Sequence, residues 1–155
     1  IDKDINIRDY LHEIISSFKE ISKKEFVFNF DQDSNPKKIS KSIEIVYGLR
    51  NFIGNANKFA KNSIFINLKS DSEFTELTVE DDGNGYPRDI ISKIGEPYLK
   101  SNYSKDKSKE GLGLGLFIGK TLLEKNFASV NCRNSKTRNG AEVVIRWKNK
   151  ELFNI

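Results

Sequence analysis

Hydrophobic and polar positions alternate with two different periods along this chain, and each period predicts one type of element. Apolar side chains recur every three or four residues from Asn6 to the pair Lys23-Lys24, which predicts an amphipathic helix. The same spacing predicts a second helix from about Ser40 to Ala60 and a third from about Gly115 to Lys125. The remaining apolar positions follow the shorter period.

That shorter period, with every second residue apolar, predicts strands. The strands are expected at Phe26–Phe30, Ile64–Leu68, Glu76–Glu80, Ser129–Arg133 and Ala141–Trp147. The turn Arg138-Asn139-Gly140 would join the last two strands, and the polar stretch Asp31–Lys38 is predicted to be a loop. The lysine-rich segment Lys100–Glu110 has one aromatic residue and is expected to be mobile. This mixture favours an α/β or α+β unit.

Composition limits the number of domains and the classes of protein to which this chain can belong. The 155 residues, 37% hydrophobic and 31% charged, suit one globular domain covering residues 1–155, and no apolar run approaches the roughly 20 residues that span a bilayer. The chain has no methionine and begins at Ile1, so we expect it to be a piece of a longer protein. A single cysteine, Cys132, excludes a disulfide framework. The net charge of +4 permits an anionic partner without requiring nucleic acid.

The second predicted helix has a polar stripe. Asn51, Asn55, Lys58 and Asn62 follow helical spacing on the face opposite the apolar residues. A solvated helix face would give the same pattern. Asparagine is, however, a poor helix former, and two asparagines one turn apart indicate a place where amide oxygens are needed, for example to complete the coordination of Mg²⁺.

The predicted strand Glu76–Glu80 runs into the sequence DDGNGYP, which begins at Asp81. Asn-Gly is a strong hairpin signal, but the residues after Pro87 resemble the start of a helix rather than a returning strand. Gly83 and Gly85 would let the backbone pass close to a planar ligand. A carboxylate at the end of the strand could accept a hydrogen bond from an exocyclic amine.

A third motif, GLGLGLFIGKT, begins at Gly111. It is not a P-loop, because Leu114 occupies the position of the required glycine, and it also lacks the GxGxxG spacing. A glycine-rich entry to a helix remains, and its free N–H groups suit a polyphosphate. Glycines needed only for packing are the alternative.

Together and in this order, the three motifs resemble the ATP-binding domain of sensor histidine kinases, and the resemblance covers essentially the whole chain. The matching segments are LRNFIGNANKFA, DDGNGYP, IGEPY, GLGLGLFI and NGAEVVI. Within the family, these motif sequences are most similar to those of the RegB/PrrB-type redox-responsive kinases. The resemblance implies the Bergerat (GHKL-type) α/β sandwich, an α+β fold in which helices cover one face of a mixed, mostly antiparallel sheet.

The resemblance also implies residue roles around Mg²⁺ and the phosphates of ATP. Asn55 matches the metal-binding position, Asn51 a position bordering the phosphates and Lys58 a nearby basic position. Hydrolytic relatives have a glutamate where this chain has Asn51, and an amide cannot take a proton from water. The site is therefore expected to hold ATP for phosphoryl transfer rather than for hydrolysis.

For the remaining parts of ATP, the resemblance assigns the two glycine motifs. Asp81 would accept from the adenine amino group, with Gly83 and Gly85 lining the base. The phosphate cradle would be formed by Gly111, Gly113 and Gly115. A lid at about residues 99–111 would close over the triphosphate. Its usual basic residue is replaced by Asn102, so Lys100 or Lys105 would contact the γ-phosphate instead.

The expected function follows from these roles. The domain would bind Mg·ATP and donate the γ-phosphoryl group to a histidine in a separate dimerisation domain of a two-component kinase. Its only histidine, His12, lacks the basic residue and proline that follow the family's acceptor histidine, so the acceptor would lie outside this chain. A stand-alone serine kinase of the anti-sigma type and a degenerate ATP-binding docking module are the alternatives.

The resemblance implies partners as well. They are the kinase's own histidine-bearing dimerisation domain and a response regulator, and the full-length parent would be a homodimer. The domain would be cytoplasmic, and the sequence leaves open whether its parent is anchored in the inner membrane. The redox-active cysteine of RegB-type kinases lies near the acceptor helix, so Cys132, on a predicted strand, is interpreted as a packing residue.

Overall fold

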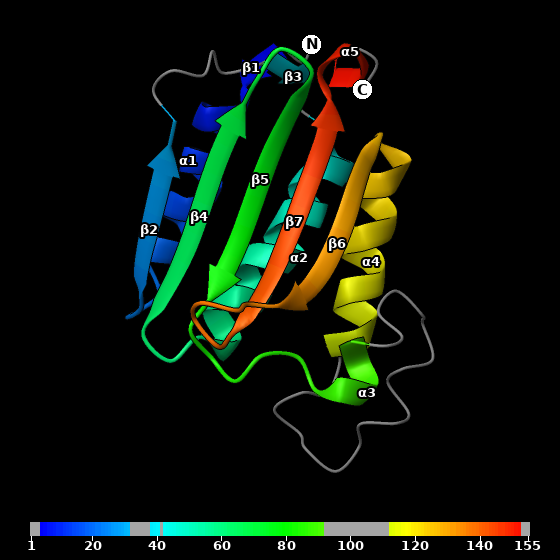
Figure 1. Cartoon of the computed structure of the whole chain (residues 1–155). Coiled ribbons are helices and arrows are strands. Elements are labelled where there is room, and N and C mark those ends of the chain that lie inside the picture. Colours follow the sequence, from blue (N-terminus) through cyan, green and yellow to red (C-terminus); the bar gives the residue numbers. More distant parts are fainter. Residues whose placement is uncertain (1–3, 32–37, 41, 92–111, 153–155) are drawn as a thin grey trace.

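A computed structural model describes residues 4–31, 38–40, 42–91 and 112–152 of the chain (Figure 1). Its strands are β1 (Asp4–Asn6), β2 (Glu25–Phe30), β3 (Lys38–Ser40), β4 (Ser63–Ser70), β5 (Phe74–Asp81), β6 (Ala128–Asn134) and β7 (Ala141–Lys148). Its helices are α1 (Ile7–Lys19), α2 (Ile43–Phe59), α3 (Arg88–Ile91), α4 (Leu112–Lys125) and α5 (Asn149–Leu152). The predicted lid and the IGEPY segment lie outside the described residues.

Five strands form one mixed sheet in the order β2-β4-β5-β7-β6. β2 and β4 are parallel, and every other neighbouring pair is antiparallel. In Figure 1, α1, α2 and α4 all lie behind this sheet, so its helical layer covers one face only. This arrangement confirms the predicted sandwich, and all five predicted strands are present.

The helix boundaries differ from the predictions at three ends. α1 stops at Lys19 rather than at Lys23-Lys24, and Ile21, which falls within the predicted helix, is 81% exposed. α2 begins at Ile43 rather than Ser40, because the side chain of Ser42 caps it by accepting from the N–H of Glu44. The residues before this cap form β3, which pairs with β1, and neither strand was predicted.

The third difference concerns α4, which begins at Leu112 rather than at about Gly115. Glycines allow this helix to pack closely on α2. A Cβ atom on Gly119 would lie 2.8 Å from the ring of Phe52, and one on Gly48 would lie 2.7 Å from Cγ of Leu123. Gly119 of the GKT triplet is thus a helix-packing glycine, which agrees with the rejection of a P-loop.

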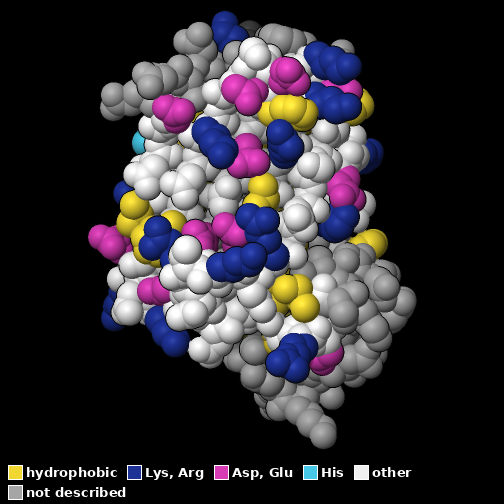
Figure 2. Space-filling model, in the orientation of Figure 1, with side chains coloured by type: hydrophobic (Ala, Val, Ile, Leu, Met, Phe, Trp, Pro, Cys, Tyr) yellow, Lys and Arg dark blue, Asp and Glu magenta, His cyan; other side chains and the backbone are white. Residues whose placement is uncertain are grey.

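The core lies between the helices and the covered face of the sheet. It includes the large, fully buried side chains Tyr10, Leu49, Phe52, Ile66, Leu77 and Trp147. The uncovered face carries cations and carboxylates side by side (Figure 2), among them the pairs Lys69–Glu76 and Arg133–Glu142. Within the part of the chain that the structure describes, no helix has the length and hydrophobicity needed to cross a membrane.

Three elements converge at one end of this sandwich. β5 ends there at Asp81, α2 reaches its last turn, and α4 begins (Figure 1). The asparagine stripe lies on α2, the sequence DDGNGYP begins at the end of β5, and residues 112–121 of the third motif lie on α4. The fold therefore brings together residues that are up to 64 positions apart in sequence, from Asn51 in α2 to Gly115 in α4.

Candidate nucleotide site

Asp81 ends β5 with a side chain that is only 3% exposed. Its Oδ1 atom accepts from the N–H of Gly83 at 2.8 Å and, more weakly, from the N–H of Ala141 at 3.4 Å. Burial raises the pKa of this carboxyl above its ordinary value, partly offset by these two N–H groups. Because both bonds end at Oδ1, the other carboxylate oxygen can accept from a ligand donor.

The chain leaving Asp81 passes close to the end of α2. A Cβ atom on Gly83 would lie far inside 3.0 Å of the carbonyl oxygen of Phe59, so only glycine fits there. Gly85 has a φ of 80°, in the left-handed region that favours glycine. The two glycines thus have structural reasons for their positions, whichever ligand they line.

Asp82 holds the same loop through a second set of hydrogen bonds. Its Oδ1 atom accepts from the N–H groups of Lys61, Asn62 and Ser63 in the turn between α2 and β4. Burial alone would raise the pKa of Asp82, but these hydrogen bonds together lower it below the ordinary carboxyl value. This role could not be predicted from the sequence. The run of polar residues after α2 gave no sign of a partner 20 residues away.

The asparagine stripe of α2 faces the first turns of α4. A Cβ atom on Gly115 would lie 3.8 Å from Oδ1 of Asn51 and 3.7 Å from Nδ2 of Asn55. Asn51 donates its own Nδ2 to the carbonyl of Tyr47, one turn earlier. The structure therefore brings both predicted asparagines to the predicted glycine entry of α4.

The amide of Asn55 is the unusual group here. Its Nδ2 atom is buried, and the described residues offer it no hydrogen-bond partner. Buried polar atoms without a hydrogen-bond partner are rare in native proteins, so we expect a bound ligand to supply the partner of this one. A half-turn of the amide exchanges nitrogen and oxygen, so Asn55 can present either a donor or an acceptor to a ligand.

The donor set fits Mg²⁺ bound together with phosphates better than it fits a protein-only metal centre. No group of three or more His, Cys, Asp or Glu side chains that could hold a metal occurs among the described residues. Mg²⁺ commonly takes only one or two protein oxygens and completes its shell with waters and phosphate oxygens. The amide oxygen of Asn55, beside that of Asn51, could supply such a ligand.

The other predicted site residues lie at the ends of α2 and α4 or outside the described residues. Lys58 is exposed in the last turn of α2, and its ammonium group lies 5.2 Å from the ring centre of Phe59. Gly113 is buried within the first turn of α4, where helical N–H groups have no intrahelical acceptor. Gly111, Lys100 and Lys105 lie outside the described residues.

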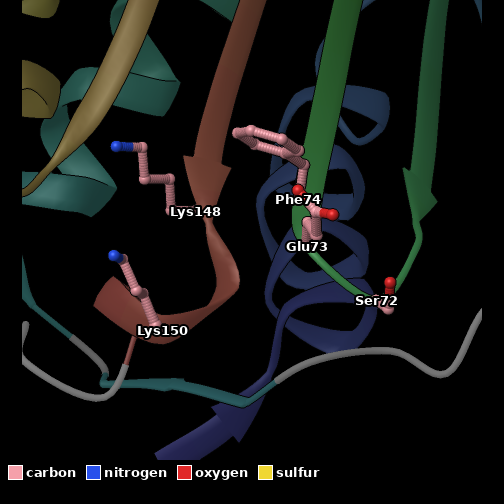
Figure 3. A pocket seen from close by; sticks show the side chains of 5 residues that line it. All are labelled: Ser72, Glu73, Phe74, Lys148 and Lys150. Atoms are coloured by element: carbon pink, nitrogen blue, oxygen red, sulfur yellow. The ribbon is translucent and has the colours of Figure 1, made fainter.

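A separate hollow of about 400 Å³ lies at the opposite end of β5 (Figure 3). It is lined by Ser72, Glu73, Phe74, Lys148 and Lys150. Because β5 runs from Phe74 to Asp81, the length of the strand separates this hollow from the asparagines and glycines described above. None of the predicted site residues lines it.

Comparison with known proteins identifies the family of this chain. Residues 40–151 match the family described as histidine kinase-, DNA gyrase B-, and HSP90-like ATPase. Sensor histidine kinase RegB from Cereibacter sphaeroides is 38% identical over 97 residues, which are 59% of this chain and 21% of that relative. The chain thus spans about a fifth of the length of this curated relative.

Solved structures share the fold. The catalytic domain of histidine kinase ThkA superimposes with a TM-score of 0.77 at 20% identity, covering 96% of this chain and 98% of that one. Full-length ShkA, solved in complex with AMPPNP, gives a TM-score of 0.74 at 20% identity and covers 94% of this chain and 30% of that one.

Proposed function

This chain belongs to the family of histidine kinase-, DNA gyrase B- and HSP90-like ATPases, and we propose that it is the catalytic domain of a two-component sensor histidine kinase. Membership of the family implies ATP binding. In the proposed reaction the domain binds Mg·ATP, and the γ-phosphoryl group passes to a histidine on a separate dimerisation domain. The likeness to RegB and to the catalytic domain of ThkA supports this choice within the family.

One observation supports phosphoryl transfer rather than ATP hydrolysis. Asn51 lies one turn before Asn55 and borders the same glycine of α4, and its amide nitrogen is bonded to the carbonyl of Tyr47. An amide in this position can orient a phosphate or a water but cannot act as a general base. Phosphoryl transfer needs mainly positioning and charge neutralisation, which this arrangement can provide.

The remaining roles follow the same proposal. Asp81 accepts from the adenine amino group, with Gly83 and Gly85 beside the base. The start of α4, with Gly111, Gly113 and Gly115, receives the phosphates on its free N–H groups. Asn55 holds Mg²⁺, which when bound neutralises phosphate charge. Lys58, Lys100 and Lys105 are the cations proposed to lie near the phosphates.

The partners are part of this proposal as well. They are a histidine-bearing dimerisation domain and a response regulator, with a homodimeric parent and no role for nucleic acid. The domain would work in the cytoplasm, and the structure of the QseC cytoplasmic segment, which shares this fold, supports that location. His12 is not the proposed acceptor. It lies on α1 with its ring edge-on to Phe28, at 4.8 Å between centres.

A transfer assay tests the proposal. The domain is mixed with γ-labelled ATP, Mg²⁺ and the parent's dimerisation domain, and acid-labile, base-stable label is expected on that domain. Asn55→Asp should abolish most of the label, because it brings a negative charge next to the triphosphate. Asn131→Asp, on the exposed face of β6, is the matched control and should transfer normally.

Other outcomes would favour the alternatives. Acid-stable label on serine would indicate a kinase of the anti-sigma type. Tight ATP binding without any labelled protein would indicate a docking module. Either result would overturn the proposed transfer to histidine.

A further inference from the structure

Asn134, the last residue of β6, forms hydrogen bonds to the backbone of Tyr86 with both the oxygen and the nitrogen of its side-chain amide. Its Oδ1 atom accepts from the N–H of Tyr86 at 2.6 Å, and its Nδ2 atom donates to the carbonyl of Tyr86 at 3.2 Å. The two segments are 48 residues apart in sequence. The side chain thus replaces the main-chain partner that a strand would give this loop.

The same amide lies against Gly85. A Cβ atom on Gly85 would be 2.8 Å from Oδ1 of Asn134, and this glycine has the positive φ of 80°. Asn134 therefore contacts the one loop residue whose backbone adopts a left-handed conformation. It holds both that residue and the next in place.

Tyr86 is held at its other end too. Its ring is buried, and its hydroxyl lies beside the thiol of Cys132, two residues before Asn134 on β6. Successive strand residues alternate between faces, so Cys132 and Asn134 point the same way. The end of β6 therefore fixes both the side chain and the main chain of Tyr86.

The β6–β7 turn, which follows Asn134, contacts β5 beside Asp81. The carboxylate of Glu80, next to Asp81 in β5, is buried and accepts from the hydroxyl of Ser135 and from Nε of Arg138. The Arg138 guanidinium in turn lies 3.5 Å from the ring centre of Phe65. Glu80 thus anchors the β6–β7 turn to the strand that carries Asp81.

We propose that Asn134 is a positioning residue for recognition of the adenine base. By holding Gly85 and Tyr86 it sets the path of the loop that starts at Asp81, and so the direction in which the free oxygen of Asp81 faces a ligand. Asn134 itself need not contact the nucleotide. This inference rests on the proposed function, in which Asp81 reads the adenine amino group.

The test compares ATP with GTP, because adenine presents an amino donor where guanine presents a carbonyl acceptor. Dissociation constants are measured for the 155-residue chain by calorimetry, with GTP by competition. In Asn134→Ala we expect ATP affinity to fall about tenfold, because the loop loses both of the hydrogen bonds that hold the backbone of Tyr86. GTP affinity should stay unchanged, so the preference for ATP should fall by the same factor.

Two further variants make the result interpretable. Asn134→Ser keeps one oxygen for the N–H of Tyr86 and should lose less than the alanine variant, with a greater chance of folding normally. Asn131→Ala, an exposed asparagine of the same strand, should change neither constant.

A merely structural role would give a different pattern. If Asn134 only stabilised the fold, ATP and GTP would weaken by the same factor, or the thermal midpoint would fall with both affinities intact. Either result would overturn the inference. Failure of the proposed function is distinguishable, since the unaltered chain would then bind ATP no better than GTP or transfer no phosphate to histidine.

Discussion

Gly140 packs directly against Asp81. A Cβ atom on Gly140 would lie far inside 3.0 Å of both the carbonyl oxygen and the Oδ1 atom of Asp81, closer than real Cβ atoms approach. The next residue, Ala141, donates its N–H to the same Oδ1 at 3.4 Å. The β6–β7 turn and the end of β5 therefore form one unit, and the position of the carboxylate depends on the absence of a side chain at residue 140.

Gly140→Ala should consequently damage both stability and ligand binding. The added methyl group meets backbone atoms that cannot move without shifting β5, and overpacking of this kind costs about 1–3 kcal/mol. We expect urea unfolding to show a loss in that range and calorimetry to show weaker ATP binding.

Gly54→Ala is the matched control for this substitution. Gly54 lies within α2, and its added Cβ would be 3.5 Å from Cζ of Phe18, an ordinary contact. Replacing a helical glycine by alanine should stabilise the domain by roughly 0.5–1 kcal/mol and leave ATP binding unchanged. Equal losses in the two variants would contradict the packing argument.

Asp81→Asn should make the nucleotide-free domain more stable while it weakens ATP binding. Burial raises the pKa of Asp81, so the folded chain holds this proton more tightly than the unfolded chain and loses stability as the pH rises through the raised pKa. An asparagine avoids that loss and can still accept from Gly83 and Ala141. We expect a higher thermal midpoint at pH 7 and ATP affinity lower by about 10- to 100-fold.

The pH dependence of the stability difference tests whether the raised pKa of Asp81 is its cause. Below the ordinary aspartate pKa of about 4, Asp81 is protonated in both states, and the stability advantage of the asparagine variant should disappear. Unchanged ATP affinity in Asp81→Asn would rule out this residue as the acceptor for adenine.

Asp82, the neighbouring carboxylate, should show the opposite pH dependence. Its pKa is lowered overall, because the N–H groups of Lys61, Asn62 and Ser63 outweigh the effect of burial. The stability it contributes is present above the ordinary carboxyl pKa and is lost as the pH falls through the lowered one. Asp82→Asn should lose roughly 1 kcal/mol at pH 7. Thermal melts at decreasing pH should show that difference closing, and a constant difference would contradict the assignment.

Local sequence patterns were enough to predict the main sheet and the helices behind it. The alternating phenylalanines of β2 and the apolar face of α2 report burial directly, since each depends only on residues a few positions apart. The spacing of Asn51 and Asn55 likewise predicted that they share a helix face, and the structure places both beside Gly115.

The contacts that shape the loop after Asp81 were not predictable in this way. Asn134 and Glu80 act across 48 and 55 residues of sequence, and neither has a local partner that marks it. β1 and β3 were missed because strands of three residues are too short to show a period. Local periodicity reports burial, whereas the fine shape of the candidate site depends on polar pairs between distant segments.

Cys132 should react slowly with alkylating reagents. Burial foremost raises the pKa of its thiol from 9.0 to about 11, against smaller opposing effects of Tyr86 and Lys120, so little thiolate exists at neutral pH. As the only cysteine of the chain, it gives an unambiguous signal with iodoacetamide. We expect labelling at pH 7.5 to be about 100-fold slower than in the urea-unfolded chain and to keep accelerating above pH 9. Rapid labelling of the folded domain would show that the thiol is accessible and ionised, and would reopen a redox role that its packing against Tyr86 argues against.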